Sequence, residues 1–103
     1  LTAFIERFPD HALTPNAQYW LGESHYARND YKKAAAAFLA GVRNYPSSNK
    51  APDSMLKLAM SLNQLGLDKQ ACGTLAELKV RHKNLSAKIA ARVAREEQAM
   101  QCQ

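Results

Sequence analysis

Few residues in this chain of 103 have the types and spacing that chemistry requires. The run from Gly22 to Tyr26, GESHY, is similar to the turn that presents a serine nucleophile in many hydrolases, but it lacks the second glycine and a preceding strand. Ser24 recurs as Ser61, 37 residues later, which is typical of a small packing residue in a repeated structure. We therefore expect Ser24 to pack within the fold rather than to attack a substrate.

The histidines and glycines form no other reactive pattern. His11, His25 and His82 are isolated in the sequence, so none has the spacing of a zinc ligand. The four glycines do not build a phosphate-binding loop. We expect a protein that is not an enzyme and that uses no metal or other cofactor.

The two cysteines, Cys72 and Cys102, are too far apart for Cys-x-x-Cys redox chemistry. They would lie close together if helices at 68–82 and 86–100 run antiparallel about the turn between them. A disulfide would then close the last hairpin and stabilise the domain by about 3 kcal/mol in an oxidising compartment. The alternative is a buried Cys72 and a frayed, free Cys102.

The sequence that positions these residues repeats itself. A period of roughly 20 to 50 residues is typical of a solenoid of stacked units, each of which cannot bury its apolar face alone. Such a period favours a binding surface over a catalytic pocket. The residues that recur unchanged after 37 positions are Ala3/Ala40, Pro9/Pro46, Pro15/Pro52, Leu21/Leu58, Ser24/Ser61, Lys32/Lys69 and Ala34/Ala71.

Each unit has the spacing of helices. No segment alternates at period two, and one apolar stripe follows helical spacing through Tyr31, Ala34, Ala35, Phe38, Val42 and Tyr45. Pro15 after Thr14 suits a helix start, and Asn29 before Asp30 suits a left-handed turn followed by a cap. The predicted fold class is all-α, a solenoid of about six antiparallel helices. We predict helices at residues 1–8, 15–28, 31–44, 52–65, 68–82 and 86–100.

The first full unit resembles the tetratricopeptide pattern W-x2-L-G-x2-Y, A-x3-F and P. The residues that match this pattern at its own spacing are Leu21, Gly22, Ala34, Phe38 and Pro46. Gln18 stands at the tryptophan position and His25 at the tyrosine position, each next to an aromatic residue. The second unit matches less well, since Lys83 stands where proline would be expected.

The repeats predict a single domain spanning residues 1–103. Residues 1–9 would be the second helix of a truncated repeat, 14–46 and 51–83 would be complete repeats, and 86–100 would be a C-terminal capping helix. No stretch approaches the roughly 18 uninterrupted apolar residues of a membrane span. The chain begins with Leu1, and we expect it to be part of a larger protein.

Three runs of the chain resemble one family of envelope proteins. The runs are PNAQYWLGES at 15–24, DYKKAAAAF at 30–38 and NYPSSNKAPD at 44–53. They resemble the C-terminal domain of the Tol-Pal system family YbgF, also called CpoB, over nearly the whole chain. The resemblance implies a periplasmic scaffold that binds TolA, with a peptidoglycan synthase as a further candidate partner, and that helps couple outer-membrane constriction to cell-wall synthesis in division. It also implies a parent protein that forms trimers through an N-terminal coiled coil.

A second envelope family is similar at fewer positions. The run from Tyr45 to Ser48, Tyr-Pro-x-Ser, also occurs in other tetratricopeptide proteins of the envelope, including BamD of outer-membrane assembly. The alternative function is therefore a subunit of such a complex. A lipidated cysteine near the start of the parent protein would favour this alternative, and a coiled coil there would favour the YbgF family.

In a helical stack the first helix of each hairpin lines the concave face. Tyr19 and Tyr26 would then either anchor a partner or pack between helices. We expect Trp20 to lie in the core. The predicted groove carries no Lys or Arg, so we expect no clamp for a peptide carboxylate. The predicted partner-binding residues are Asn16, Tyr19, Glu23 and Tyr26 in the first unit and Asp53, Leu56, Met60 and Asn63 in the second.

The chain has a net charge of +5, and residues 50–103 hold nine Lys and Arg against five Asp and Glu. Lys88, Arg92 and Arg95 form a helical stripe near the C-terminus. We expect a solvated face rather than a nucleic-acid site, because no recognised nucleic-acid motif accompanies the stripe. An acidic protein partner or anionic lipid head groups would use the same patch.

Overall fold

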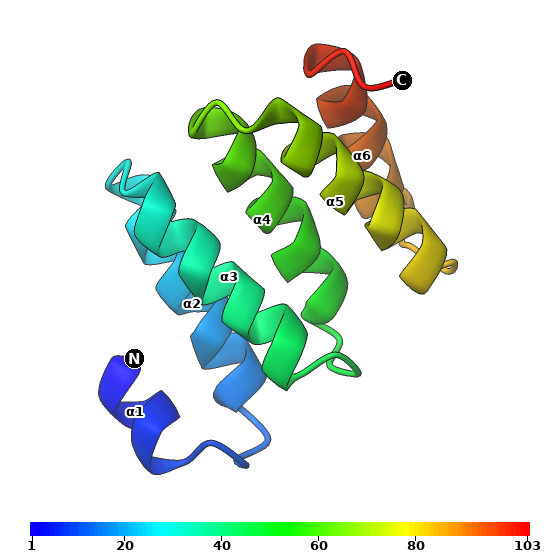
Figure 1. The fold of residues 1–103 in the computed structure, drawn as a ribbon. Helices are drawn as coiled ribbons and strands as arrows, with labels where there is room; N and C mark the ends of the chain where they lie inside the picture. The colour runs from blue at the N-terminus through cyan, green and yellow to red at the C-terminus, as the bar shows by residue number, and fades with distance from the viewer.

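Six helices follow one another along the chain, and the computed structural model describes all of residues 1–103 (Figure 1). Every helix end lies within one residue of its predicted place. The all-α fold predicted from the repeat is therefore confirmed. The helices are α1 (Thr2–Arg7), α2 (Thr14–Ala27), α3 (Tyr31–Asn44), α4 (Ala51–Gln64), α5 (Asp68–Arg81) and α6 (Ala87–Ala99).

A single left-handed residue turns the chain in each of the hairpins α2–α3 and α4–α5. Asn29, with a φ of 61°, joins α2 to α3, and Gly66, with a φ of 79°, joins α4 to α5. Only a few residue types adopt this conformation at low cost, and asparagine and glycine are the most common. Asp30 then caps α3, because its Oδ1 accepts a hydrogen bond of 3.2 Å from the backbone N–H of Lys33.

The hairpins stack so that the first helix of each lies in one layer. Helix α4 contacts α2 on one side and α6 on the other, whereas α3 and α5 each pack against α4 and have no Cα atoms within 8 Å of one another. Figure 1 shows α2 behind α3 and α6 behind α5. Because α6 continues the layer of α2 and α4, these three helices share one face of the molecule. None of the six helices has the length and apolar character that crossing a membrane requires.

Most of the core lies around α4. The larger of two apolar clusters contains residues of α3, α4, α5 and α6. The smaller cluster, Ala34, Phe38 and Leu58, contains residues of α3 and α4. Burying each large apolar side chain contributes about 1.5 to 3 kcal/mol. The larger cluster consists of Val42, Met55, Leu56, Ala59, Met60, Leu75, Leu78 and Val93.

Trp20 lies outside this core, so the expectation that it is buried is wrong. Its side chain is 53% exposed, because the buried face of α2 is formed instead by Ala17, Gln18 and Gly22. Gln18 occupies the tryptophan position of the repeat pattern and is buried there. Its Nε2 donates a hydrogen bond of 2.8 Å to the backbone oxygen of Ala37, which satisfies the buried amide.

Helix α1 is short and has no buried residue. It contacts only α2, and the segment after it is held by two hydrogen bonds. Tyr45 Oη donates to the backbone oxygen of Pro9 at 3.0 Å, and Thr14 Oγ1 donates to the backbone oxygen of Phe8. The assignment of residues 1–9 to a truncated repeat stays a prediction.

The disulfide predicted for the last hairpin is confirmed. It joins Cys72, near the start of α5, to Cys102, just after α6, and the two Cα atoms are 5.5 Å apart. The bond spans 30 residues, which include most of α5 and all of α6. It therefore fastens α6 to the rest of the stack.

The ring of Phe38 of α3 occupies the space that a side chain at Gly22 of α2 would need. A Cβ built on Gly22 would lie 2.5 Å from Cε1 of Phe38, whereas a Cβ on Gly73 of α5 would meet no atom within 4 Å. We predict that Gly22→Ala lowers the free energy of unfolding by about 1 to 3 kcal/mol through overpacking. Gly73→Ala is the matched control and should raise it by about 0.5 to 1 kcal/mol, because alanine favours the helix. Urea denaturation measures both, and a Gly22→Ala variant as stable as wild type would contradict the close approach.

We predict that Cys72→Ser with Cys102→Ser lowers the free energy of unfolding by about 3 to 4 kcal/mol, since the bond removes loop entropy from the unfolded chain. Thermal melts with and without reductant provide the measurement. Reductant should shift the wild-type melt toward that of the double variant and leave the variant unchanged. A variant as stable as the oxidised wild type would show that the bond does not fasten α6.

Candidate functional site

A hollow of about 190 Å³ lies on the face shared by α2, α4 and α6. It is therefore formed by α2 and α4, the first helices of the two hairpins, and by α6, which continues their layer, as a helical stack predicts for its concave side. Residues of α6 form one wall of the hollow, residues of α4 form its floor, and Tyr19 of α2 lies at the other end. The lining residues are Tyr19, Asp53, Leu56, Lys57, Lys88, Ile89, Arg92 and Arg95.

Tyr19 lines the α2 end of the hollow, and Trp20 and Lys50 lie next to Tyr19, outside the lining itself. The rings of Tyr19 and Trp20 meet edge to face, with their centroids 5.3 Å apart. Lys50 Nζ lies 4.8 Å from the centroid of Tyr19 and 5.8 Å from that of Trp20. This ammonium is attracted to the electron-rich ring faces, which holds it near the rings. The α2 end thus offers an exposed apolar surface next to a positive charge.

An ion pair joins α2 to α4 beside these rings. Lys57 Nζ lies 3.1 Å from Glu23 Oε1, and both side chains are mostly covered. The contact brings the charges together without the alignment of a good hydrogen bond, since Glu23 Oε1 has no hydrogen-bond partner. Lys57 Nζ also lies 4.8 Å from the centroid of the Tyr26 ring. The charge of Lys57 is therefore largely balanced within the protein.

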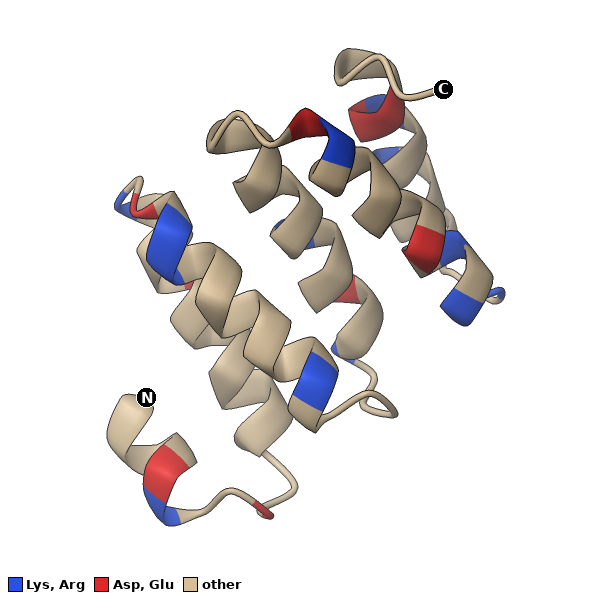
Figure 2. Cartoon of the chain, in the orientation of Figure 1, with Lys and Arg blue, Asp and Glu red and all other residues tan.

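The α6 wall of the hollow is basic. Lys88, Arg92 and Arg95 all line it, and charged positions along α6 are visible in Figure 2. Arg92 Nε bonds Glu96 Oε2 at 3.1 Å, one turn further along the same helix. Lys88 and Arg95 form no ion pair. Two positive charges thus remain without a partner on this wall.

The eight predicted groove positions carry no Lys or Arg, but four other residues that line the hollow do: Lys57, Lys88, Arg92 and Arg95. Lys57 lies on α4 next to Leu56, and the other three lie on α6, on which no groove position was predicted. The period of 37 residues contained a signal that would have found the rest. Extended once more, it places Ile89 at the start of α6 in register with Pro15 and Pro52, so the helix predicted as a C-terminal cap stands at the position of a first helix.

Three of the eight predicted partner-binding residues line the hollow. Tyr19 and Asp53 do so with partly exposed side chains, and Leu56 forms the floor with only 5% of its surface exposed. Met60 belongs to the core, where it packs in one cluster with Val93 of α6, so the expectation that it faces a partner is wrong. It is buried because α6 covers this part of α4.

The other four predicted residues lie outside the hollow. Glu23 pairs with a residue that lines it, and Tyr26 packs edge to face on Tyr31 with a centroid distance of 5.1 Å. Asn63 Nδ2 donates to Asp68 Oδ1 at 2.9 Å across the turn between α4 and α5. Asn16 is half-buried on α2. Of the two roles considered for Tyr26, the packing role is the one visible in these contacts.

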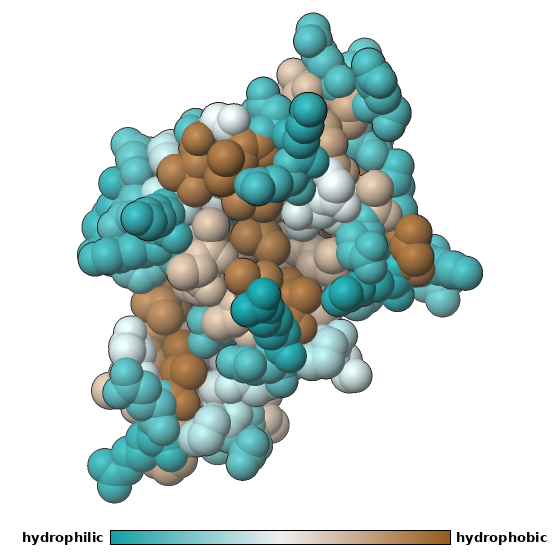
Figure 3. Space-filling model, viewed as in Figure 1, coloured by the Kyte–Doolittle hydropathy of each residue, from teal (hydrophilic) through white to brown (hydrophobic).

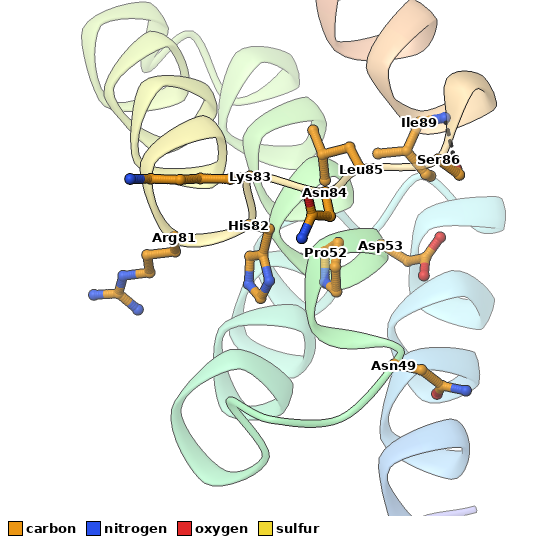
Figure 4. Close-up of a pocket in the computed structure, with 10 residues that line it drawn as sticks. All are labelled: Asn49, Pro52, Asp53, Arg81, His82, Lys83, Asn84, Leu85, Ser86 and Ile89. Atoms are coloured by element: carbon orange, nitrogen blue, oxygen red, sulfur yellow. Dashed lines mark hydrogen bonds between the residues drawn. The ribbon is translucent and has the colours of Figure 1, made fainter.

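A second cavity of about 460 Å³ lies at the turn between α5 and α6 (Figure 4). It adjoins the hollow, because Asp53 and Ile89 line both. Figure 4 shows His82 and Asn84 of the turn near Pro52 at the start of α4, whereas the side chains of Arg81 and Lys83 extend away from it. Most of its lining is polar side chains of turns, so it extends the hollow toward solvent rather than enclosing a small molecule.

Burial and nearby carboxylates act on the tyrosine at the end of the hollow. Burial, followed by the negative charges of Glu23 and Asp53, raises the pKa of Tyr19 to about 12. Burial is also the main cause that raises the pKa of Tyr26, with smaller effects from Tyr31 and Glu96. Both rings therefore stay neutral throughout the physiological range.

Tyr19 gives a pH prediction whose sign is fixed by this shift. Its pKa is 10.0 in the unfolded chain and about 12 in the folded one, so the unfolded chain releases the proton first. The contribution of the neutral Tyr19 ring to the free energy of unfolding is fully present below pH 10 and is lost as the pH rises toward 12. Tyr19→Phe should therefore lose less stability than wild type over this interval in denaturation at stepped pH. Identical losses in the two proteins would contradict the shift.

Comparison with known proteins agrees with this architecture. Tetratricopeptide repeats match residues 16–48 and 53–84, which cover α2 with α3 and α4 with α5. No curated protein matches the chain. Tetratricopeptide repeats are protein-interaction modules, and the two matched units overlap the repeats predicted at 14–46 and 51–83. The chain belongs to the tetratricopeptide repeat family.

Proposed function

We propose that this chain is the partner-binding domain of a periplasmic scaffold of the Tol-Pal type. Its partner would be TolA, with a peptidoglycan synthase as a further candidate, and it would help coordinate outer-membrane constriction with peptidoglycan synthesis in cell division. The observation that carries the proposal is the hollow between α2, α4 and α6, with the half-buried ring of Tyr19 at one end, the exposed ring of Trp20 beside it, and free cations on one wall.

The side chains around the hollow are suited to a protein partner. Tyrosine, tryptophan and arginine are the residues that most often dominate the binding energy of protein interfaces. Tyr19, Trp20 and Arg95 are all accessible here, and the rings lose little rotamer freedom on binding. The hollow has mixed charges and no enclosed apolar cavity of the kind that a small ligand fills.

The choice of TolA and of the periplasm depends on two further features. The runs at 15–24, 30–38 and 44–53 resemble the YbgF family, and two of them include the residues of the aromatic end, Tyr19, Trp20 and Lys50. The disulfide between Cys72 and Cys102 suits an oxidising compartment such as the periplasm. The alternative, a BamD-like subunit of an outer-membrane assembly complex, would share the compartment but not the partner.

Capture of purified TolA by the immobilised domain tests the proposal. We predict that wild type retains TolA and that Tyr19→Ala with Trp20→Ala weakens binding at least about tenfold, since each aromatic anchor contributes on the order of 1 kcal/mol or more. The matched control is Val80→Ala, which removes an apolar side chain that is 65% exposed on α5 and lies outside the hollow.

The control should bind as wild type does. Equal capture by the aromatic variant would exclude the α2 end of the hollow as the binding site. Failure of the folded wild-type domain to capture TolA would count against the Tol-Pal assignment and would favour the alternative complex.

A further inference from the structure

We propose that the hollow between α2, α4 and α6 binds an acidic segment of a partner protein, whose carboxylates meet Lys88 and Arg95 while an apolar side chain rests on Trp20. This inference rests on the proposed function, in that the concave face must bind a protein. It adds the chemistry of the bound segment, which neither the repeat family nor the resemblance specifies.

The charges around the hollow leave an excess of positive charge after internal pairing. Glu23 is paired with Lys57 and Glu96 with Arg92, so these four groups balance one another. The cations that remain are Lys88 and Arg95 on α6 and Lys50 at the aromatic end, against one carboxylate, Asp53. An acidic segment lying along the hollow would meet a cation at each end.

The two free cations on α6 are placed to act together. Lys88 and Arg95 are seven residues apart on one helix, which puts them two turns apart on the same side, and both line the hollow. Both are exposed, so their ends can reach a ligand without prior loss of a contact. The guanidinium of an arginine binds a carboxylate through two parallel hydrogen bonds, which adds geometric selectivity to the charge.

Nucleic acid and membrane surfaces fit this site less well than an acidic peptide. The phosphates of a nucleic acid form a continuous negative line, and the carboxylates of Glu23, Asp53 and Glu96 interrupt the cations along the hollow. A flat membrane surface cannot follow a concave wall. Separate carboxylates on a peptide can each approach a cation and avoid Asp53, while a neighbouring apolar residue reaches the exposed ring of Trp20.

The apolar hollow on the opposite face has a different character. It lies between α3 and α5 over Met55 and Leu58 of α4, and Figure 3 shows apolar atoms gathered along this part of the surface. It has no excess of cations, and charge complementarity favours no particular occupant there. An acidic segment is therefore expected on the concave face alone.

The test uses three short fluorescein-labelled peptides that alternate leucine with glutamate, glutamine or lysine. Fluorescence anisotropy measures their binding to the wild-type domain. We expect the glutamate peptide to bind at least about tenfold more tightly than the glutamine peptide and the lysine peptide to bind weakest. Raising NaCl from about 50 to 200 mM should weaken the glutamate peptide most, because salt screens exposed charges.

Two pairs of substitutions locate the site. Lys88→Gln with Arg95→Gln removes the free cations of the hollow and should weaken the glutamate peptide about tenfold. Lys32→Gln with Arg43→Gln is the matched control: it removes one lysine and one arginine from α3, both exposed, without ion pairs and outside the hollow. The control should change affinity less than about twofold. Charge reversal, Lys88→Glu with Arg95→Glu, should turn the preference toward the lysine peptide.

Several results would overturn the inference. The glutamate and glutamine peptides could bind equally, or the hollow and control variants could lose the same affinity. A single-stranded oligonucleotide or anionic lipid vesicles could bind more tightly than the glutamate peptide. The folded domain could also fail to bind the glutamate peptide at about millimolar concentration.

Capture of TolA by the same variants separates this inference from the proposed function. If Lys88→Gln with Arg95→Gln captures TolA as wild type does, the acidic-segment inference fails while the Tol-Pal proposal stands. If wild type binds the glutamate peptide through these cations but does not capture TolA, the acidic-segment inference stands and the Tol-Pal assignment fails.

Discussion

The packing of α6 against α4 is the contact on which the concave face depends. Val93 of α6 lies in one apolar cluster with Leu56 and Met60 of α4, and without α6 these two side chains would face water. The same helix supplies the basic wall of the hollow. Two further bonds hold it in place: the disulfide from Cys72 to Cys102 and the ion pair between Lys79 and Glu97 of α5 and α6. Stability and binding surface are therefore coupled through one helix.

The two faces of the stack differ because the two layers of helices have different spacing. The first helices touch one another, so their side chains can form ion pairs between units, as Glu23 and Lys57 do. The backbones of the second helices, α3 and α5, lie further apart, and an apolar opening over Met55 is left between them. The layer of α2, α4 and α6 thus holds the basic hollow, whereas the layer of α3 and α5 leaves an apolar opening.

Helix positions and the disulfide could be predicted from the sequence because they depend on local chemistry. Pro15, Asn29 and Gly66 set starts and turns through their own backbone preferences, which no distant contact needs to supply. The pairing of Cys72 with Cys102 followed from one antiparallel hairpin of short connection. Both kinds of inference concern segments that are neighbours in the chain.

The face on which a side chain lies could not be decided in the same way. Trp20 was expected in the core, yet Gln18 takes the buried position because the close contact of Gly22 with Phe38 sets the rotation of α2. The amino-acid sequence by itself determined six helices, their repeat and their crosslink. Only the tertiary structure decided that α6 joins α2 and α4 in one layer. Val93 of α6 packs in one cluster with residues of α4, and this contact between distant segments brings the cations of α6 to the hollow.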